Sequence, residues 1–211
     1  KPFVLLREKL GPDVNIYVGD MFEASDFEGF WNDETHKNTY LDSHYYHVFA
    51  ETPRSFSPRQ HIAYVCEKNT RDTNSCCYAS DDPAIHGKTP SQGMKRIIGE
   101  WSVSFDTLVC TKLDEVMDSY RQPNSDKLEE FNNRIISVER ADFLRNFAES
   151  QMVQYETFDT GVSAGWFYWN FKMEGGAFLE WDYLRGVREG WIPKFTEGDK
   201  FINSRHLFGS C

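Results

Sequence analysis

The chain has 211 residues, enough for one well-buried domain but fewer than the about 250 of a complete eight-stranded β/α barrel. Its 23 basic and 33 acidic residues give a formal net charge of −10, which argues against nucleic acid or an anionic membrane surface as a partner. Aromatic residues reach 16 %, which favours stacking surfaces for a neutral polymer, with an aromatic-rich core as the alternative. No apolar run reaches the roughly 18 to 20 residues of a membrane helix.

The first part of the chain predicts the end of a helix followed by a buried strand. Residues 1–10 resemble the last turns of a helix, which Gly11 and Pro12 end. Residues 14–20 form a near-continuous apolar strand, typical of a parallel sheet, and its end delivers Asp20 and Phe22. Apolar residues at helical spacing over 26–38 predict a helix packed on the sheet. Since the chain lacks an initiator Met, we expect its true N-terminus to lie upstream.

Residues 40–49 predict the next strand, one face of which should look into a barrel. A period of two places His44 and Tyr46 on one face and Phe49 on the other. His44 also suits a core histidine, and Tyr46 suits a cap on the barrel interior. The stretch 51–92 is long and polar, with a helix predicted only around residues 58–66.

The strand over residues 96–100 ends on Glu100, between Gly99 and Trp101. An indole offers a sugar ring an apolar platform while a neighbouring carboxylate does chemistry, so we interpret Glu100 as a nucleophile. A glutamate in a strand-end turn is the alternative. The segment 126–158 predicts helix, and its later part carries a core stripe at spacings of three and four: Phe143, Leu144, Phe147, Ala148, Met152 and Tyr155.

A fourth strand over residues 164–171 also ends in aromatic groups, including Trp169. Strands whose functional groups collect at one end, separated by connections with helices, are typical of the C-terminal face of a β/α barrel. The sequence has no internal repeat and no linker between two domains. It therefore predicts an α/β fold that amounts to half a barrel.

Three segments, in this order, resemble the exo-β-1,3-glucanases of glycoside hydrolase family 5: residues 41–49 (Leu-Asp-Ser-His-Tyr-Tyr-His-Val-Phe), 99–102 (Gly-Glu-Trp-Ser) and 165–172 (Gly-Trp-Phe-Tyr-Trp-Asn-Phe-Lys). The resemblance covers about residues 14–193 and is weakest over 67–92 and 111–140. It implies that residues 1–211 are the C-terminal part of a single catalytic domain, strands five to eight of a (β/α)8 TIM barrel.

The resemblance also assigns roles to residues of this chain. Glu100 corresponds to the nucleophile of a retaining mechanism, and His44 and Tyr46 to residues that bond to the catalytic carboxylates. Trp169 is similar to the platform under the sugar, and Phe22 and Phe49 to a clamp on the next glucose. Apart from the resemblance, their places at strand ends add Asp20 and Trp101 to the predicted substrate-binding residues. A clamp role for Phe49 requires the chain to bend after Tyr46.

Retaining hydrolysis needs a second carboxyl group, about 5 to 5.5 Å from the nucleophile. The family carries this acid/base glutamate in an Asn-Glu pair at the end of strand four, and no such pair occurs in this sequence. We therefore expect it upstream of Lys1, and expect the fragment alone to be inactive. The resemblance further implies a Cys66–Cys211 disulfide and a cis Trp169–Asn170 peptide bond, and leaves the partners of Cys76, Cys77 and Cys110 open.

These observations predict an extracellular or cell-wall glycosidase that releases glucose from the non-reducing ends of β-1,3-glucan. We expect no metal, no organic cofactor and no nucleic acid partner, and a monomer when the protein is complete. Two alternatives stay open. One is a β-1,4- or β-1,6-glucan hydrolase of the same family, and the other is a non-catalytic glucan-binding half barrel.

Overall fold

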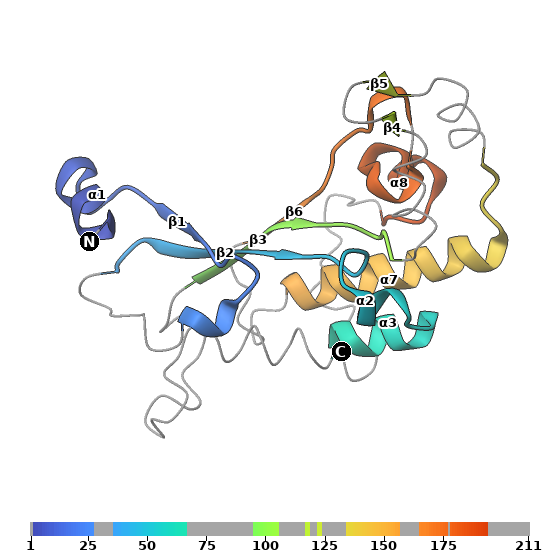
Figure 1. The fold of residues 1–211 in the computed structure, drawn as a ribbon, viewed down its shortest axis with the longest axis horizontal. Helices are drawn as coiled ribbons and strands as arrows, with labels where there is room; N and C mark the ends of the chain where they lie inside the picture. Colours follow the sequence, from blue (N-terminus) through green and yellow to red (C-terminus); the bar gives the residue numbers. More distant parts are fainter. Residues whose placement is uncertain are drawn as a thin grey trace.

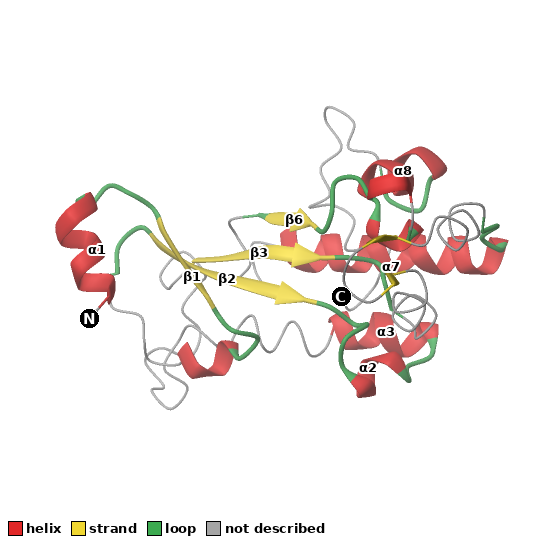
Figure 2. Cartoon of the chain, turned by 45° about the horizontal axis from the view of Figure 1, so that its top comes forward, coloured by secondary structure: helices red, strands yellow, loops and turns green. Residues whose placement is uncertain are grey.

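A parallel sheet of four strands forms the centre of the computed structural model, which describes residues 2–27, 36–66, 95–105, 117–118, 122–123, 134–156, 165–176 and 178–193. The strands follow one another in space as in sequence: β1 (Ile16–Gly19), β2 (Thr39–Tyr45), β3 (Lys95–Trp101) and β6 (Trp166–Tyr168) (Figures 1 and 2). Every pairing in this sheet is parallel, so the C-terminal ends of the strands meet at one edge. A separate two-stranded antiparallel ladder joins β4 (Met117–Asp118) and β5 (Gln122–Pro123).

One face of the sheet is covered by helices. These are chiefly α7 (Val138–Glu156) and α3 (Pro58–Tyr64), with the short α2 (Glu51–Arg54) beside them (Figure 1). The predicted stripe on α7 is confirmed, because all six of its residues are at most 8 % exposed and belong to one core cluster with Ile98, Trp101 and Val103. The long apolar side chains of α7 therefore fix this face of the sheet as the core side.

Local sequence signals set the ends of several helices. Ser57 and Gln60 form a capping box at the start of α3, with Pro58 in the first turn. The Asp182 side chain accepts a hydrogen bond from the Arg185 amide at the start of α8 (Tyr183–Glu189), and Gly190 ends that helix with a φ of 95°. These signals fix where α3 and α8 begin and where α8 ends.

Some predicted boundaries were wrong. Strand β2 ends at Tyr45 rather than at Phe49, and residues 134–137 precede α7 without being helical. Of the helix predicted over residues 26–38, the structure describes only the 3-10 turn η1 (Ala24–Phe27) and the turn at 36–38. The predicted helix at the N-terminus is confirmed as α1 (Pro2–Leu10).

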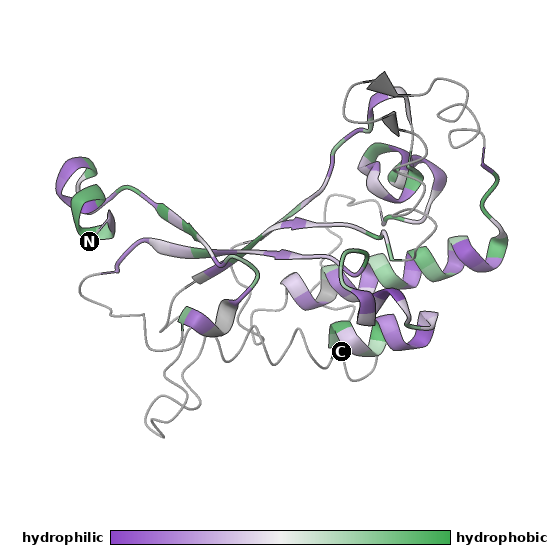
Figure 3. Cartoon of the chain, viewed as in Figure 1, coloured by the Kyte–Doolittle hydropathy of each residue, from purple (hydrophilic) through white to green (hydrophobic). Residues whose placement is uncertain are grey.

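The other face of the sheet is open in the part of the chain that the structure describes. Tyr17, Phe167 and Trp169 are about half exposed or more, and α1 buries none of its residues although it carries hydrophobic side chains (Figure 3). A four-stranded parallel sheet with helices on one face is compatible with half of a β/α barrel, whose interior would lie on the open face. None of the helices in the described ranges is long and apolar enough to cross a membrane.

Candidate active site

A β-bulge at Gly99 aims Glu100 at the open face. Ile98 and Trp101 both lie in the core beneath the sheet, although residues three apart point to opposite faces of a regular strand. The pairing with β2 shows the extra residue: Ser43 pairs with Ile98, whereas His44 pairs with Glu100. The bulge therefore reverses the alternation and places Glu100 beside His44.

Two side chains from β2 and the residue after it hold the Glu100 carboxylate. The Tyr46 hydroxyl donates a hydrogen bond to Oε2 at 2.7 Å, and Nδ1 of His44 lies 3.3 Å from the same oxygen. Burial, the hydrogen bond to Glu100 and the negative charge of Glu100 all raise the pKa of Tyr46. Tyr46 therefore stays protonated and acts as a fixed donor to the carboxylate.

The opposite edge of the His44 ring faces a residue that the sequence analysis did not select. Nε2 of His44 lies 3.6 Å from Oδ2 of Asp42, so the imidazole stands between two carboxylates. Asp42 is two residues before His44 on β2 and faces the same side of the sheet. The period of two around His44 is the signal that could have identified it.

Exposed aromatic residues follow β2 and β6, the two strands that flank Glu100. Trp169, directly after β6, is 49 % exposed, and its amide donates a hydrogen bond to the Trp101 carbonyl at 2.8 Å. The Trp169–Asn170 peptide bond is cis, as predicted. Phe49 is 60 % exposed, and its ring lies 5.1 Å from that of Tyr46. The chain does bend after β2, which is the condition for Phe49 to face the site.

Phe22 reaches the site from a turn after β1. Its ring meets His44 edge-on at 6.0 Å, and 70 % of the residue is exposed. Met21 and Phe22 both have positive φ values, and the nearly buried Asp20 carboxylate accepts a hydrogen bond from the Phe22 amide at 2.9 Å. Asp20 therefore shapes the turn that presents Phe22.

Trp101 does not join the other predicted substrate-binding residues. Its side chain is fully buried on the helix side, where its ring packs against Tyr155, Trp166 and Tyr168. The same bulge that turns Glu100 to the open face turns Trp101 away from it. In this arrangement Trp101 supports β3 from behind and offers no surface to a sugar.

A buried ionic cluster that the sequence analysis missed lies behind the aromatic residues. Glu180 is fully buried and accepts hydrogen bonds from Arg134 and Arg140, with Nη2 atoms at 2.5 and 2.6 Å. The next residue, Trp181 in η6 (Leu179–Trp181), contacts the rings of Tyr46 and Phe49 at 5.5 and 5.9 Å. The cluster thus anchors the loop that backs the site.

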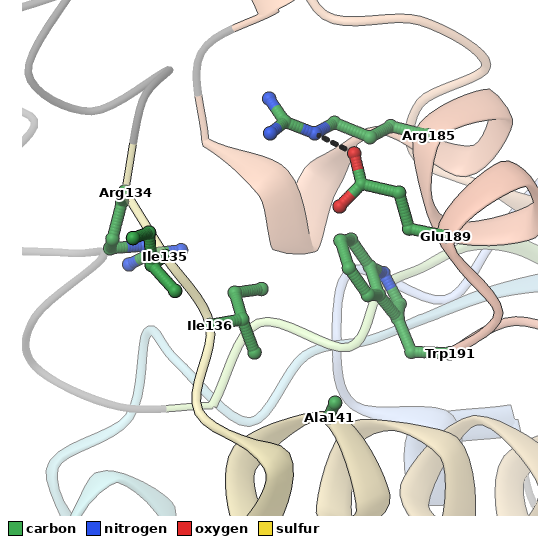
Figure 4. A pocket seen from close by; sticks show the side chains of 7 residues that line it. All are labelled: Arg134, Ile135, Ile136, Ala141, Arg185, Glu189 and Trp191. Carbon is green, nitrogen blue, oxygen red and sulfur yellow. Dashed lines mark hydrogen bonds and ion pairs between the residues drawn. The ribbon is translucent and has the colours of Figure 1, made fainter.

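A pocket of about 510 Å3 lies elsewhere, between α8 and the segment leading into α7 (Figure 4). It is lined by Arg134, Ile135, Ile136, Ala141, Arg185, Glu189 and Trp191, and none of the predicted site residues is among them. Within the described ranges, no group of three or more His, Cys, Asp or Glu side chains is arranged to hold a metal ion. Cys66 follows α3, whereas Cys211 lies outside the described residues, so their pairing stays a prediction.

Comparison with known proteins supports a distant relationship to glucan 1,3-β-glucosidases. The chain is 26 % identical over 197 residues to the probable glucan 1,3-beta-glucosidase A of Aspergillus clavatus, covering 87 % of the chain and 40 % of that protein. It is 28 % identical over 178 residues to glucan 1,3-beta-glucosidase 2 of Candida albicans, covering 80 % and 32 %. The glucan 1,3-beta-glucosidase of Blumeria graminis is 25 % identical over 201 residues, covering 88 % and 41 %.

The chain thus spans about a third to two fifths of the length of these relatives. No protein-family model matches it. The comparisons support a distant relationship to proteins named as glucan 1,3-beta-glucosidases, while membership of family 5 and correspondence to the C-terminal half of its barrel stay predictions.

Proposed function

We propose that this chain contributes the nucleophile half of a retaining glycosidase that releases glucose from the non-reducing ends of β-1,3-glucan. The observation that carries the proposal is the Glu100 carboxylate, which faces the open side of the sheet with Tyr46 and His44 on one of its oxygens. The names of the relatives support the glucan substrate.

In this proposal Glu100 attacks the anomeric carbon, and the leaving sugar departs with a proton from a second carboxyl group. The Tyr46 hydroxyl fixes the position of the attacking carboxylate, which reduces the freedom lost on reaching the transition state. Trp169 lies on the same open face and supplies the apolar platform beneath the ring, while Phe22 and Phe49 contact the next sugar.

We place the general acid outside these 211 residues, because the relatives are longer and the sequence has no Asn-Glu pair. The fold is then the C-terminal half, strands five to eight, of a (β/α)8 barrel, and the open face is the barrel interior. We place the complete enzyme outside the cell or in the cell wall, where its polymer substrate is found.

A substrate whose leaving group needs no proton tests Glu100 without the missing acid. With 2-deoxy-2-fluoroglucosyl fluoride, a bond forms between a Glu100 oxygen and C1, the C1–F bond breaks, and fluoride leaves with the electron pair. The C2 fluorine slows the later hydrolysis, so the glycosyl group stays on the enzyme. Mass spectrometry of the chain, and of the natural protein that carries it, should find the label on Glu100.

The Glu100→Gln variant should take no label, and the exposed Glu23→Gln should label like the wild type. The Tyr46→Phe variant should label about tenfold more slowly or worse, since a hydrogen bond to a charged group contributes roughly 1.5 to 3 kcal/mol. Retained glucan binding without any label on the wild-type protein would refute catalysis and favour a glucan-binding half barrel. Glucose release from β-1,3- but not from β-1,4- or β-1,6-glucan by the natural protein would establish the linkage.

A further inference from the structure

We propose that Asp42 is a positioning residue that fixes the His44 imidazole so that its Nδ1 edge faces Glu100. The proposal rests on the proposed function in one respect, which is that Glu100 is the group being positioned for attack. Asp42 itself contacts His44 and the backbone of Gly99, and it acts on Glu100 only through His44.

The first observation is the line of groups along the open face. Oδ2 of Asp42 lies 3.6 Å from Nε2 of His44, and Nδ1 of His44 lies 3.3 Å from Oε2 of Glu100. The two carboxylates approach opposite edges of one planar ring. A partner on the far nitrogen of a histidine sets the tautomer and the orientation of the ring. Without Asp42, the ring could rotate and Glu100 would lose one of its two neighbours.

The second observation is that Gly99 leaves the space in which the Asp42 carboxylate sits. A Cβ atom on residue 99 would lie 2.0 Å from Oδ1 and 2.8 Å from Cγ of Asp42. Gly99 is also the extra residue of the bulge that aims Glu100. The absence of a side chain at this position thus allows the bulge and the Asp42 carboxylate to occupy the same part of the sheet.

The third observation argues against a role in stability alone. Oδ1 of Asp42 is buried and has no hydrogen-bond partner among the residues that the structure describes. Burying a carboxylate oxygen without a partner is unfavourable, so packing does not explain an aspartate here. The contact of Oδ2 with His44 does explain it.

The experiment compares Asp42→Ala and Asp42→Asn with the exposed Asp142→Asn on α7 as a control. The readouts are the rate of Glu100 labelling by 2-deoxy-2-fluoroglucosyl fluoride and the 15N signals of the His44 ring. We expect Asp42→Ala to label about 10- to 100-fold more slowly at saturating reagent, as expected for a reacting group displaced by up to about 1 Å. The reagent concentration for half-saturation should change little, and the His44 ring signals should shift.

Asp42→Asn keeps the shape and one oxygen acceptor, so its labelling rate should fall less than that of Asp42→Ala. In a His44→Phe background, adding Asp42→Ala should not lower the labelling rate further, because Asp42 acts through His44. If Asp42→Ala does not fold, Asp42→Ser replaces it, since its hydroxyl is too short to reach His44. Labelling at the wild-type rate with unchanged ring signals, or an undiminished loss in the His44→Phe background, would overturn the proposal. If even the wild type takes no label, the proposed function fails, and the ring signals alone decide the role of Asp42.

Discussion

Replacing Gly99 by alanine tests the geometry on which the site depends. The added Cβ would lie 2.0 Å from Oδ1 of Asp42, whereas ordinary contacts begin at 3.4 Å, so the two atoms must separate by 1.4 Å (3.4 minus 2.0). The backbone of Gly99 is not in the left-handed region, so the clash with Asp42 is the main effect. Overpacking of this kind costs about 1 to 3 kcal/mol of the free energy of unfolding.

Gly19 provides a matched control in the same sheet. A Cβ atom there meets no atom within 4 Å, and its φ is also outside the left-handed region. Gly19→Ala should therefore change the free energy of unfolding by no more than about 0.5 kcal/mol. Urea titrations of both variants measure the difference, and the rate of Glu100 labelling should fall in Gly99→Ala alone.

The double variant Gly99→Ala/Asp42→Ala removes the clash by removing the carboxylate. The two substitutions should be coupled. The free energy of unfolding of the double variant should be about 0.5 to 3 kcal/mol higher than the sum of the two single effects predicts. If Gly99→Ala is as mild as Gly19→Ala, the Asp42 carboxylate does not pack on Gly99 and the reasoning fails.

Two further predictions concern groups behind the site. Burial and the neighbouring His61, whose Nδ1 is 2.8 Å from that of His47, lower the pKa of His47 to about 3. Between pH 6.5, near the pKa of an unfolded histidine, and pH 3, His47 binds a proton in the unfolded chain but not in the folded protein. The free energy of unfolding therefore keeps its full value above pH 6.5 and is lower by about 2 kcal/mol at pH 5. Urea titrations at both pH values should show this loss in the wild type and less of it in His47→Gln; an equal loss in both would contradict the assignment. Removing the buried Glu180 takes away the carboxylate that Arg134 and Arg140 share, so Glu180→Ala should lower the free energy of unfolding by about 3 to 5 kcal/mol. The partly exposed Glu189→Gln should cost less than about 1 kcal/mol, and equal costs would show that the buried cluster is not stabilising.

The parts of the fold that follow from local periodicity could be predicted. The apolar runs around Ile16 and Ile98 specify strands buried in a parallel sheet, and the spacing of Phe143, Phe147 and Met152 specifies the covered face of α7. Parallel strands align their C-terminal ends, which is why residues as distant as His44 and Glu100 could be expected to meet.

The bulge could not be predicted from alternation. A regular strand would place Glu100 on the same face as Ile98, buried under α7, and would expose Trp101 instead. Residue types and the motif led to two expectations, that Trp101 contacts the substrate and that Glu100 is the nucleophile. Of these, only the role of Glu100 agrees with the orientation that the bulge at Gly99 imposes. One inserted residue moves the side chains that follow it to the opposite face of the sheet, and the sequence shows no periodic signal of the change.

Contacts outside the sheet between side chains far apart in the sequence could not be predicted either. Glu180 lies 46 positions from Arg134 in the chain, and no local pattern indicates that the two side chains meet in a buried cluster. Asp42, by contrast, could have been selected from its spacing to His44. After the bend that follows Tyr45, the consecutive residues His47 and Val48 are both buried, which a count of alternating residues does not reveal.

The Tyr168 hydroxyl connects two parts of the chain that otherwise share no secondary structure. It accepts a hydrogen bond from the Val103 amide after β3 and donates one to the Glu180 carbonyl in η6. Nearby, the Asn170 amide bonds to the Trp181 carbonyl at 2.8 Å. These bonds tie η6 to the residues that follow β3 and β6. Between these ties, the Met173 amide donates a hydrogen bond to Asp182, the residue that caps α8, so shortening or lengthening the chain here would also disturb the start of that helix.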